Sequence, residues 1–430
     1  MKRLFILAFS FVAVKASAQT LTLQEAINIA LQNRLEIQIA KNNLEISTVN
    51  NHIGIAGGLP TVNGTVTNTE QITSVNQKLS TGTTIKRDWA ASNNLQAGVT
   101  ASQLLYNGMR VVSTKHRLEE IQKQSEQLLN AQVQNVMADV MLQYFDIVRQ
   151  QDYVSTILSA IESAKQRLNI VEVRQSVGLA NNADLFQAQI DVNTLNQSLE
   201  QQRLVIDQAK TDLLRSLNLR PDSLVNISDT IIVERGIQLA PVLEAVKANP
   251  QVLALDQQVR INEYLIRETA AQRYPTVRLN GGINFGRNQA AAGQVLYNQS
   301  LGPNLGVSVA IPIYNGGVVK RQIKIAEINT ENAILNRNNI VADLNANAVR
   351  NYQAYTRTLA QADSAQKNYQ ISQQLLELTL LRFQLGQATI IEVREAQRSF
   401  EDAGYRRTNL SYAAKVSEIE LRRLSNRLTF

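Results

Sequence analysis

The sequence contains no cysteine, and this absence removes two classes of structure at once. Without cysteine the chain can form neither a disulfide framework nor a thiolate metal site. Histidine is almost as scarce, because only His52 and His116 occur and they lie far apart in the sequence. We expect both at the surface, so the sequence predicts no metal site and no cofactor.

Motifs of catalysis and of nucleotide binding are missing as well. The chain has no G-x-S-x-G, no phosphate-binding loop and no G-x-G-x-x-G pattern. Nothing in it places a nucleophile, a general base or a metal, so the sequence does not indicate an enzyme. The formal net charge of +7 is mild for 430 residues, and no basic patch with interleaved aromatic residues occurs. We therefore expect no nucleic-acid partner.

Long apolar runs are also absent after the first residues. Lys2 and Arg3 precede the apolar segment 4–14, and Ala16-Ser17-Ala18 fits a cleavage site, so residues 1–18 are predicted to be a signal peptide. No later run reaches the roughly 20 apolar residues of a membrane-spanning helix. If this chain crosses a membrane, it must do so as a closed β-barrel.

Glycine and proline are scarce and clustered, which leaves two very long stretches with neither residue. These stretches are Met109–Val177 and Val318–Leu385. Their apolar residues recur at mixed spacings of three and four, as in a coiled coil. At about 1.5 Å per residue, each stretch predicts a helix roughly 100 Å long. Each is followed by a glycine-containing turn and a second helix that runs back, residues 183–217 and 390–424.

The chain reads as a tandem duplication. Tyr106 and Tyr314 are 208 positions apart, and the same offset relates Gly108 to Gly316 and Gly178 to Gly386. The expected organisation is a signal peptide (1–18), a first repeat (19–218), a connector (219–240) and a second repeat (241–430). Each repeat holds a β-hairpin, at about 60–107 and 275–314, and a helical hairpin, at about 109–217 and 318–425.

Each repeat also begins with a helical region, followed by the segments with period two. The helical regions are 21–55, with a break at Asn33-Arg34, and 241–271, with a break at Asn249-Pro250. Threonine, valine and small residues then alternate, as in strands. The segments that alternate are 61–67, 95–101, 275–279 and 305–310, with loops expected at 77–89 and 287–300 and a β-like stretch at 230–233 in the connector.

The hairpins have two interpretations. Their alternation of apolar with small or polar residues suits strands that span a bilayer with one face in lipid and one in water. Alternatively, each hairpin lies on a soluble core. Four strands are too few to close a barrel with a hole, since the smallest barrels need about eight. Three chains would supply twelve strands, and the edge strands of each chain would pair with its neighbours.

The order of these segments resembles the TolC-like outer membrane efflux proteins over nearly all of residues 21–425. The most specific stretches are Leu104–Gly108 with Pro312–Gly316, and Arg382–Val393. The resemblance implies a mixed, mainly α fold, in which long helical hairpins form an α-barrel tunnel and four strands contribute to a 12-stranded transmembrane β-barrel in a homotrimer. It also implies a barrel in the bacterial outer membrane, a helical tunnel in the periplasm, and docking to a periplasmic adaptor and an inner-membrane RND or ABC-type pump.

The same resemblance assigns roles near the closed end of the tunnel. Glu392 and Glu395 fall where the family carries acids that face the pore constriction. A ring of such carboxylates favours cations. A second interpretation of Glu392 stands beside the first, because Thr389-Ile390-Ile391-Glu392 is also a capping box at a helix start.

In the family, polar links between the two helical hairpins hold the tip of the tunnel closed. The residues of this chain that match those links lie in and beside the two turns. Asp184 aligns with an acid that accepts one such link, but Phe383 stands where the family carries a tyrosine and has no hydroxyl to donate. Arg174 and Arg382 either pair with Asp184 or Glu392 or complement the C-termini of their helices. The first turn contains Gly178 and the second contains Gly386. The junction between barrel and tunnel is expected at six other residues: Pro60, Tyr106, Gly108, Pro275, Tyr314 and Gly316.

Two functions therefore compete at this stage. The resemblance implies a passive exit duct of a tripartite efflux or type I secretion system, whose cargo is delivered by the pump. The alternative is a secreted or surface fibrous coiled-coil protein, which would explain the long helices but not two hairpins of bilayer length.

Overall fold

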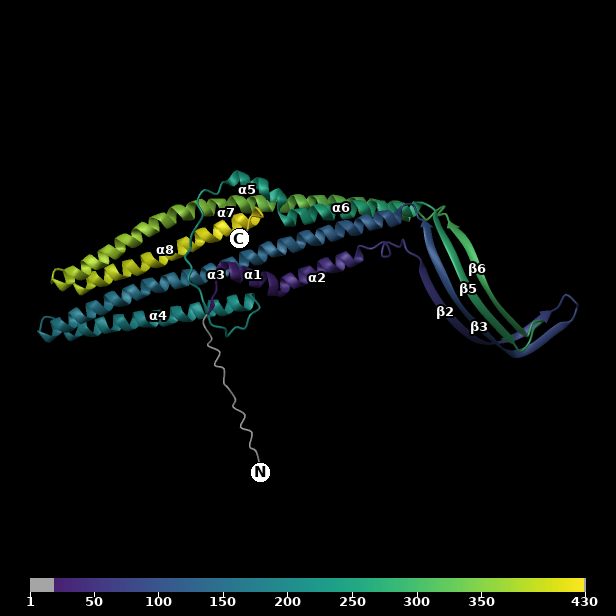
Figure 1. Ribbon diagram of the computed structural model, residues 1–430, viewed down its shortest axis with the longest axis horizontal. Coiled ribbons are helices and arrows are strands. Elements are labelled where there is room, and N and C mark those ends of the chain that lie inside the picture. The colour runs from purple at the N-terminus through teal and green to yellow at the C-terminus, as the bar shows by residue number, and fades with distance from the viewer. Residues whose placement is uncertain (1–18, 429–430) are drawn as a thin grey trace, which may run out of the picture. The chain divides into compact units, whose positions relative to one another are not determined.

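The computed structural model describes residues 19–428 of the chain, which are mainly helical (Figure 1). They divide into two compact units. The helical unit comprises residues 19–41, 128–252 and 340–428, and the sheet unit comprises 42–127 and 253–339. The signal peptide predicted for residues 1–18 lies outside the described part. Within residues 19–428, none of the helices combines the length and apolar character needed to cross a membrane.

The two halves of the chain repeat the same order of elements. The long helices α3 and α7 have 67 residues each, and the helices that follow them, α4 and α8, have 35 each. This equality confirms the duplication. The first half contains β1 (Gln19–Thr20), α1 (Leu23–Asn33), α2 (Leu35–Asn50), β2 (Thr61–Lys78), β3 (Thr84–Tyr106), α3 (Arg110–Ser176) and α4 (Asn182–Ser216). The second contains β4 (Val225–Asn226), α5 (Leu239–Ala245), η1 (Val246–Ala248), α6 (Pro250–Ala270), η2 (Ala271–Arg273), β5 (Thr276–Ala290), β6 (Tyr297–Ala310), α7 (Val318–Gln384) and α8 (Ile390–Leu424).

In the helical unit, α4 runs back along α3 and α8 runs back along α7, so that each half contributes a helical hairpin (Figure 1). The two hairpins share a core of mostly small and apolar side chains. Its buried members include Ala160, Ala164, Ala188, Phe383, Ala396 and Phe400. Small residues let helix backbones approach closely. At Gly404 of α8 an added Cβ would lie 2.4 Å from Cγ2 of Thr156 in α3.

The sheet unit is built around one four-stranded antiparallel sheet in the order β2-β3-β5-β6. The central pair β3 and β5 joins the hairpin of one half to the hairpin of the other. Strands β2 and β6 are the two edges of this sheet, and each has a hydrogen-bonded neighbour on one side within the described chain. Backbone groups along the outer sides of both strands are therefore available to pair with another strand.

Two predictions about the strands and loops are wrong. The expected loops 77–89 and 287–300 are mostly strand, because β2 and β3 are joined by a short turn at 79–83 and β5 and β6 by residues 291–296. Pairing with a neighbouring strand outweighs polar composition there. Conversely, the β-like stretch 230–233 is not a strand, and β1 pairs instead with β4 at Val225–Asn226. Side chains hold the stretch: Lys415 donates to the Ile232 carbonyl at 2.8 Å, and Glu418 accepts from the Glu234 N–H at 3.0 Å.

Candidate functional site

The two turns that end the helical hairpins are built alike. Gly178 follows α3 with φ of +79°, and Gly386 follows α7 with φ of +77°, which is a left-handed conformation that favours glycine. The N–H of Leu179 donates to the Arg174 carbonyl at 2.7 Å, and that of Gln387 donates to the Arg382 carbonyl at 2.8 Å. Each long helix therefore ends in the same hydrogen-bonded reversal.

Arg174 links the two turns through Phe383. Its Nη2 donates to the Phe383 carbonyl, in the last turn of α7, and its guanidinium carbon lies 4.6 Å from the centre of the Phe383 ring. Phe383 is buried at 4% exposure. Phe383, which lacks a tyrosine hydroxyl, thus contributes its carbonyl and its aromatic face to this contact, and Arg174 supplies the hydrogen-bond donor.

The remaining gate residues stay close to their own turns. Arg382 Nη2 donates to the Gln387 carbonyl at 3.0 Å, and the Asp184 N–H donates to Asn181 Oδ1 at 2.8 Å at the start of α4. Among residues 19–428, neither Arg174 nor Arg382 forms an ion pair with Asp184 or Glu392. Arg382 caps its own turn, as the helix-terminus interpretation predicts.

Glu392 does form the predicted capping box with Thr389. The Glu392 Oε2 accepts from the Thr389 N–H at 2.6 Å and from its hydroxyl at 3.0 Å, while the Glu392 N–H donates back to Thr389 Oγ1 at 3.2 Å. These bonds, first that from the Thr389 backbone, lower the pKa of Glu392 below its ordinary value. Glu395 lies one turn later on α8 and is exposed. Both carboxylates therefore lie near the start of α8, three positions apart.

A buried charge cluster near the turns was missed from the sequence. Arg167 of α3 has no solvent exposure, and its Nη2 donates to Asp191 Oδ2 of α4 at 2.7 Å. Arg394 Nε of α8 lies 3.4 Å from the same oxygen, and Gln187 donates to Oδ1 at 2.8 Å. Burial lowers the pKa of Arg167 against the opposing effect of Asp191. The signal was present in the sequence, since Arg167 occupies a core position in the α3 seam formed by Ala160, Ala164 and Val171.

With this geometry in place, comparison with known proteins identifies the chain. The family model "Outer membrane efflux protein" matches residues 26–219 and 242–427, one segment in each half. The chain belongs to the outer membrane efflux protein family. Its members are channels of the outer membrane and not enzymes, which makes this protein an outer membrane efflux channel with a helical periplasmic part.

Individual relatives of this efflux protein are distant. It is 25% identical to the outer membrane protein TolC of Vibrio cholerae over 344 residues, covering 77% of this chain and 76% of that one. It is 25% identical to the toxin and drug export protein A of Aggregatibacter actinomycetemcomitans over 290 residues, or 66% of this chain and 62% of that one. The crystal structure of the Campylobacter jejuni CmeC outer membrane channel superposes with a TM-score of 0.77 at 18% identity, over 100% of this chain and 96% of the other, and so has the same fold.

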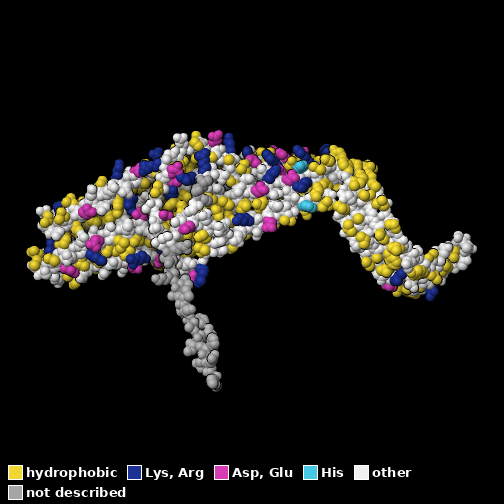
Figure 2. All heavy atoms as spheres, in the orientation of Figure 1, with side chains coloured by type: hydrophobic (Ala, Val, Ile, Leu, Met, Phe, Trp, Pro, Cys, Tyr) yellow, Lys and Arg dark blue, Asp and Glu magenta, His cyan; other side chains and the backbone are white. Residues whose placement is uncertain are grey.

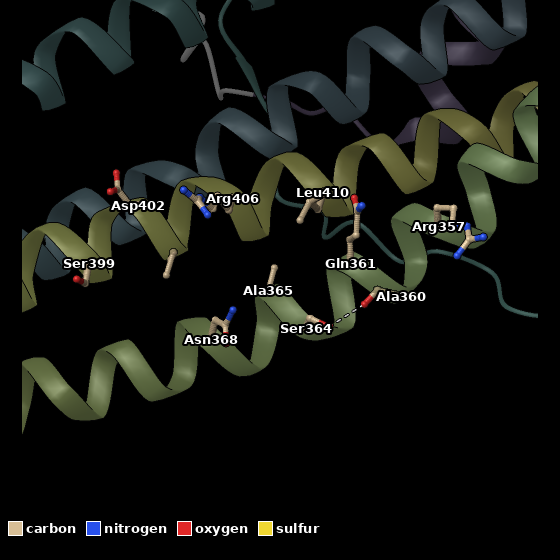
Figure 3. A pocket seen from close by; sticks show the side chains of 11 residues that line it. Arg357, Ala360, Gln361, Ser364, Ala365, Asn368, Ser399, Asp402, Arg406 and Leu410 are labelled. Carbon is tan, nitrogen blue, oxygen red and sulfur yellow. Dashed lines mark hydrogen bonds between the residues drawn. The ribbon is translucent and has the colours of Figure 1, made fainter.

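A groove lies between α7 and α8 of the efflux protein, away from the turns (Figure 3). Its volume is about 650 Å³, and small side chains such as Ala360, Ser364, Ala365 and Ser399 form much of its lining. Arg357, Asp402 and Arg406 supply charge of both signs at the same groove. It combines space for an apolar side chain with groups that can form ion pairs.

The residues expected at the junction differ between the halves. Tyr106 ends β3, and Gly108 has φ of +70° with Tyr274 Cβ only 2.6 Å from where a Cβ would stand. In the second half, β6 ends at Ala310, before Tyr314, and nothing lies within 4 Å of the corresponding position at Gly316. Pro60 and Pro275 directly precede β2 and β5. The sequence repeat is therefore kept at the junction while the local packing is not.

Proposed function

We propose that this efflux protein is the trimeric exit duct of a tripartite efflux or type I secretion system, through which solutes move passively. The observation that carries the proposal is the four-stranded sheet with one apolar face and two available edges. Exposed apolar side chains such as Val66, Leu301 and Leu305 are more than two-thirds exposed on that sheet, and hydrophobic side chains are prominent over it in Figure 2. A surface of this kind suits contact with lipid.

In a ring of three copies, the unpaired outer sides of β2 and β6 would be hydrogen-bonded to each other. Strand β6 of one copy would pair with β2 of the next, and the twelve strands would close into one cylinder with no edge left. A closed ring is the symmetry expected when one surface patch binds a different patch on the next copy. Four strands alone cannot enclose a path for solute.

The helical unit supports the same assembly. Large apolar side chains recur along an exposed stripe of α7, and at the residue that directly follows it, at spacings of three and four: Ile371, Leu375, Leu378, Leu381 and Leu385. Exposed fractions on this stripe range from 47% for Leu375 to 64% for Leu385. Such a stripe is costly in water and is covered when a neighbouring helix packs on it. A neighbouring copy is the proposed cover.

The functional roles at the turns follow from this assembly. Glu392 and Glu395 of three copies would place six carboxylates around the constriction, where they favour cations and hold divalent ions. A periplasmic adaptor would bind at the turns around Gly178 and Gly386 and along the groove between α7 and α8, and an RND or ABC-type pump would deliver the cargo. The contact of Arg174 with Phe383 would help to keep the turns together until the adaptor binds.

Planar lipid bilayers test the duct and its acid ring separately. We expect discrete channel conductance from the purified protein, and a fall in conductance when a divalent cation is added. Glu392→Gln combined with Glu395→Gln should weaken the divalent block at least about tenfold, because the fixed charges that bind the ion are gone. Glu200→Gln with Glu244→Gln, at exposed acids of α4 and α5, is the matched control. Absence of any conductance would refute the duct, whereas an unchanged block would refute only the ring.

A further inference from the structure

The register of the four strands sorts their side chains onto two faces. Residues paired across neighbouring strands lie on the same face, so Thr65, Gly98, Asn284 and Gly302 share one. We name this the polar face. It comprises the odd-numbered residues 61–71 of β2 and the even-numbered residues 92–102 of β3, 278–288 of β5 and 298–308 of β6.

Neutral residues occupy almost the whole polar face. Threonine, serine, asparagine, glutamine and glycine fill these positions, and Arg278 is the one charged side chain among them. Its neutral neighbours hydrogen-bond to one another: Ser102 donates to Asn280 at 2.8 Å, Asn280 to Ser308 at 3.0 Å, and Asn284 to Asn304 at 3.1 Å. The opposite face carries the large exposed apolar residues and therefore suits lipid.

Arg278 stands at one end of this face. It lies directly across from Leu104 of β3 and Ser308 of β6, and it is exposed. Within residues 19–428 its side chain forms no hydrogen bond or ion pair. The other arginine of β5, Arg287, lies on the opposite face and donates to Asn93 at 3.4 Å. Arg278 is thus an uncompensated positive charge on a surface whose other residues are all neutral.

We infer that Arg278 determines the charge selectivity of the strand-lined part of the solute path, where it favours anions and the anionic groups of the cargo. The inference rests on the proposed trimeric duct, in which the polar face meets water and three copies of Arg278 form a ring. A ring of fixed positive charge raises the local concentration of anions. The neutral remainder of the face neither repels nor holds ions, so the ring is the charged filter of this segment.

Thiol labelling tests which way the side chain points. Because the chain has no cysteine, Arg278→Cys gives a single reactive site. The thiolate attacks 2-sulfonatoethyl methanethiosulfonate, which forms a mixed disulfide and releases methanesulfinate. In a bilayer we expect rapid modification with a step in conductance. Leu279→Cys, the next residue and on the apolar face, is the matched control and should stay unmodified. Labelling at 279 but not at 278 would overturn the inference.

Reversal potentials in a KCl gradient test the selectivity itself. The measurements use the Glu392→Gln, Glu395→Gln background, so that the acids proposed for the constriction do not contribute. A unit charge about 6 Å from an ion in water changes the local concentration of that ion roughly threefold, upward for chloride and downward for potassium. We therefore expect Arg278→Gln to lower the chloride-to-potassium permeability ratio roughly tenfold. Arg278→Glu should lower it further, and Arg278→Lys should preserve it. A permeability ratio that is unchanged in both Arg278→Gln and Arg278→Glu refutes the inference. If neither the variants nor the unmutated protein conduct ions, the proposed duct is refuted instead.

Discussion

At the scale of single residues, the start of α8 shows how one side chain can serve two purposes. The family resemblance implies a pore role for Glu392 and its motif predicts a capping role, and the structure places its carboxylate in the cap, on the Thr389 backbone and hydroxyl. The carboxylate remains exposed. Capping and the proposed pore role are therefore compatible, since hydrogen bonding stabilises the ionised form that a cation would bind.

The cap predicts a pH range for the divalent block. Its hydrogen bonds lower the pKa of Glu392 from an ordinary value of 4.5. A carboxyl whose pKa is lower in the folded protein stays ionised as the pH falls past 4.5, and its contribution to stability is lost only on passing through the lowered pKa. We expect part of the block to persist just below pH 4.5. Thr389→Ala removes the hydroxyl bond and should shift the midpoint of the block to higher pH.

Titration of the block in bilayers checks this expectation. Thr358→Ala is the control, because the Thr358 hydroxyl donates to the Ala354 carbonyl at 2.7 Å within α7 and contacts neither turn. A midpoint that is the same in Thr389→Ala as in the unmutated protein would show that the cap does not set the pKa of the blocking carboxylate.

At the scale of elements, regular patterns made most of the fold predictable. The stretch that forms α7 contains no glycine or proline and ends near a glycine, so the sequence predicts α7 within one residue of its observed bounds. The capping box of Thr389 and Glu392 specifies the observed start of α8 at Ile390. The strand ends were not, because polar segments such as 84–89 become strand through pairing with a partner rather than through their own composition. The Arg174–Phe383 contact depends on how two hairpins meet, and no local pattern encodes that.

Gly404 provides a test of helix packing within the helical unit. A glycine inside a helix costs about 1 kcal/mol relative to alanine, so its presence in α8 requires a reason. The reason here is Thr156, whose Cγ2 would lie 2.4 Å from an added Cβ. We expect Gly404→Ala to destabilise the protein by about 1–2 kcal/mol despite the better helix propensity, because overpacking costs more.

A double-mutant cycle separates packing from propensity. Thr156→Ala removes the clashing groups. It also removes a buried hydroxyl, because Thr156 Oγ1 has no hydrogen-bond partner among the described residues. In that background the penalty of Gly404→Ala should shrink. Thermal unfolding in detergent provides the measurement, and an equal loss in both backgrounds would contradict the packing explanation.

At the scale of the whole molecule, the single chain leaves features that are incomplete on their own. Both sheet edges can accept a further strand, and the stripe on α7 exposes Leu375 and Leu378 at 47% and 56%. The sheet edges belong to the sheet unit and the stripe to the helical unit, and a neighbouring copy would cover both. Assembly therefore explains in one step why a chain that has a buried core in its helical unit also presents apolar residues in rows.

The stripe gives a prediction for assembly. Leu375→Lys combined with Leu378→Lys would place six ammonium groups in the proposed interfaces of a trimer, where burying each charge without a partner costs several kcal/mol. We expect these variants to shift from trimer to monomer in native mass spectrometry from mild detergent. Gln373→Lys adds a charge to the same helix away from the stripe, where Gln373 bonds Glu377 at 3.1 Å, and should stay trimeric. Intact trimers of the double variant would mean that the stripe faces water or another partner, and that the sheet edges alone hold the copies together.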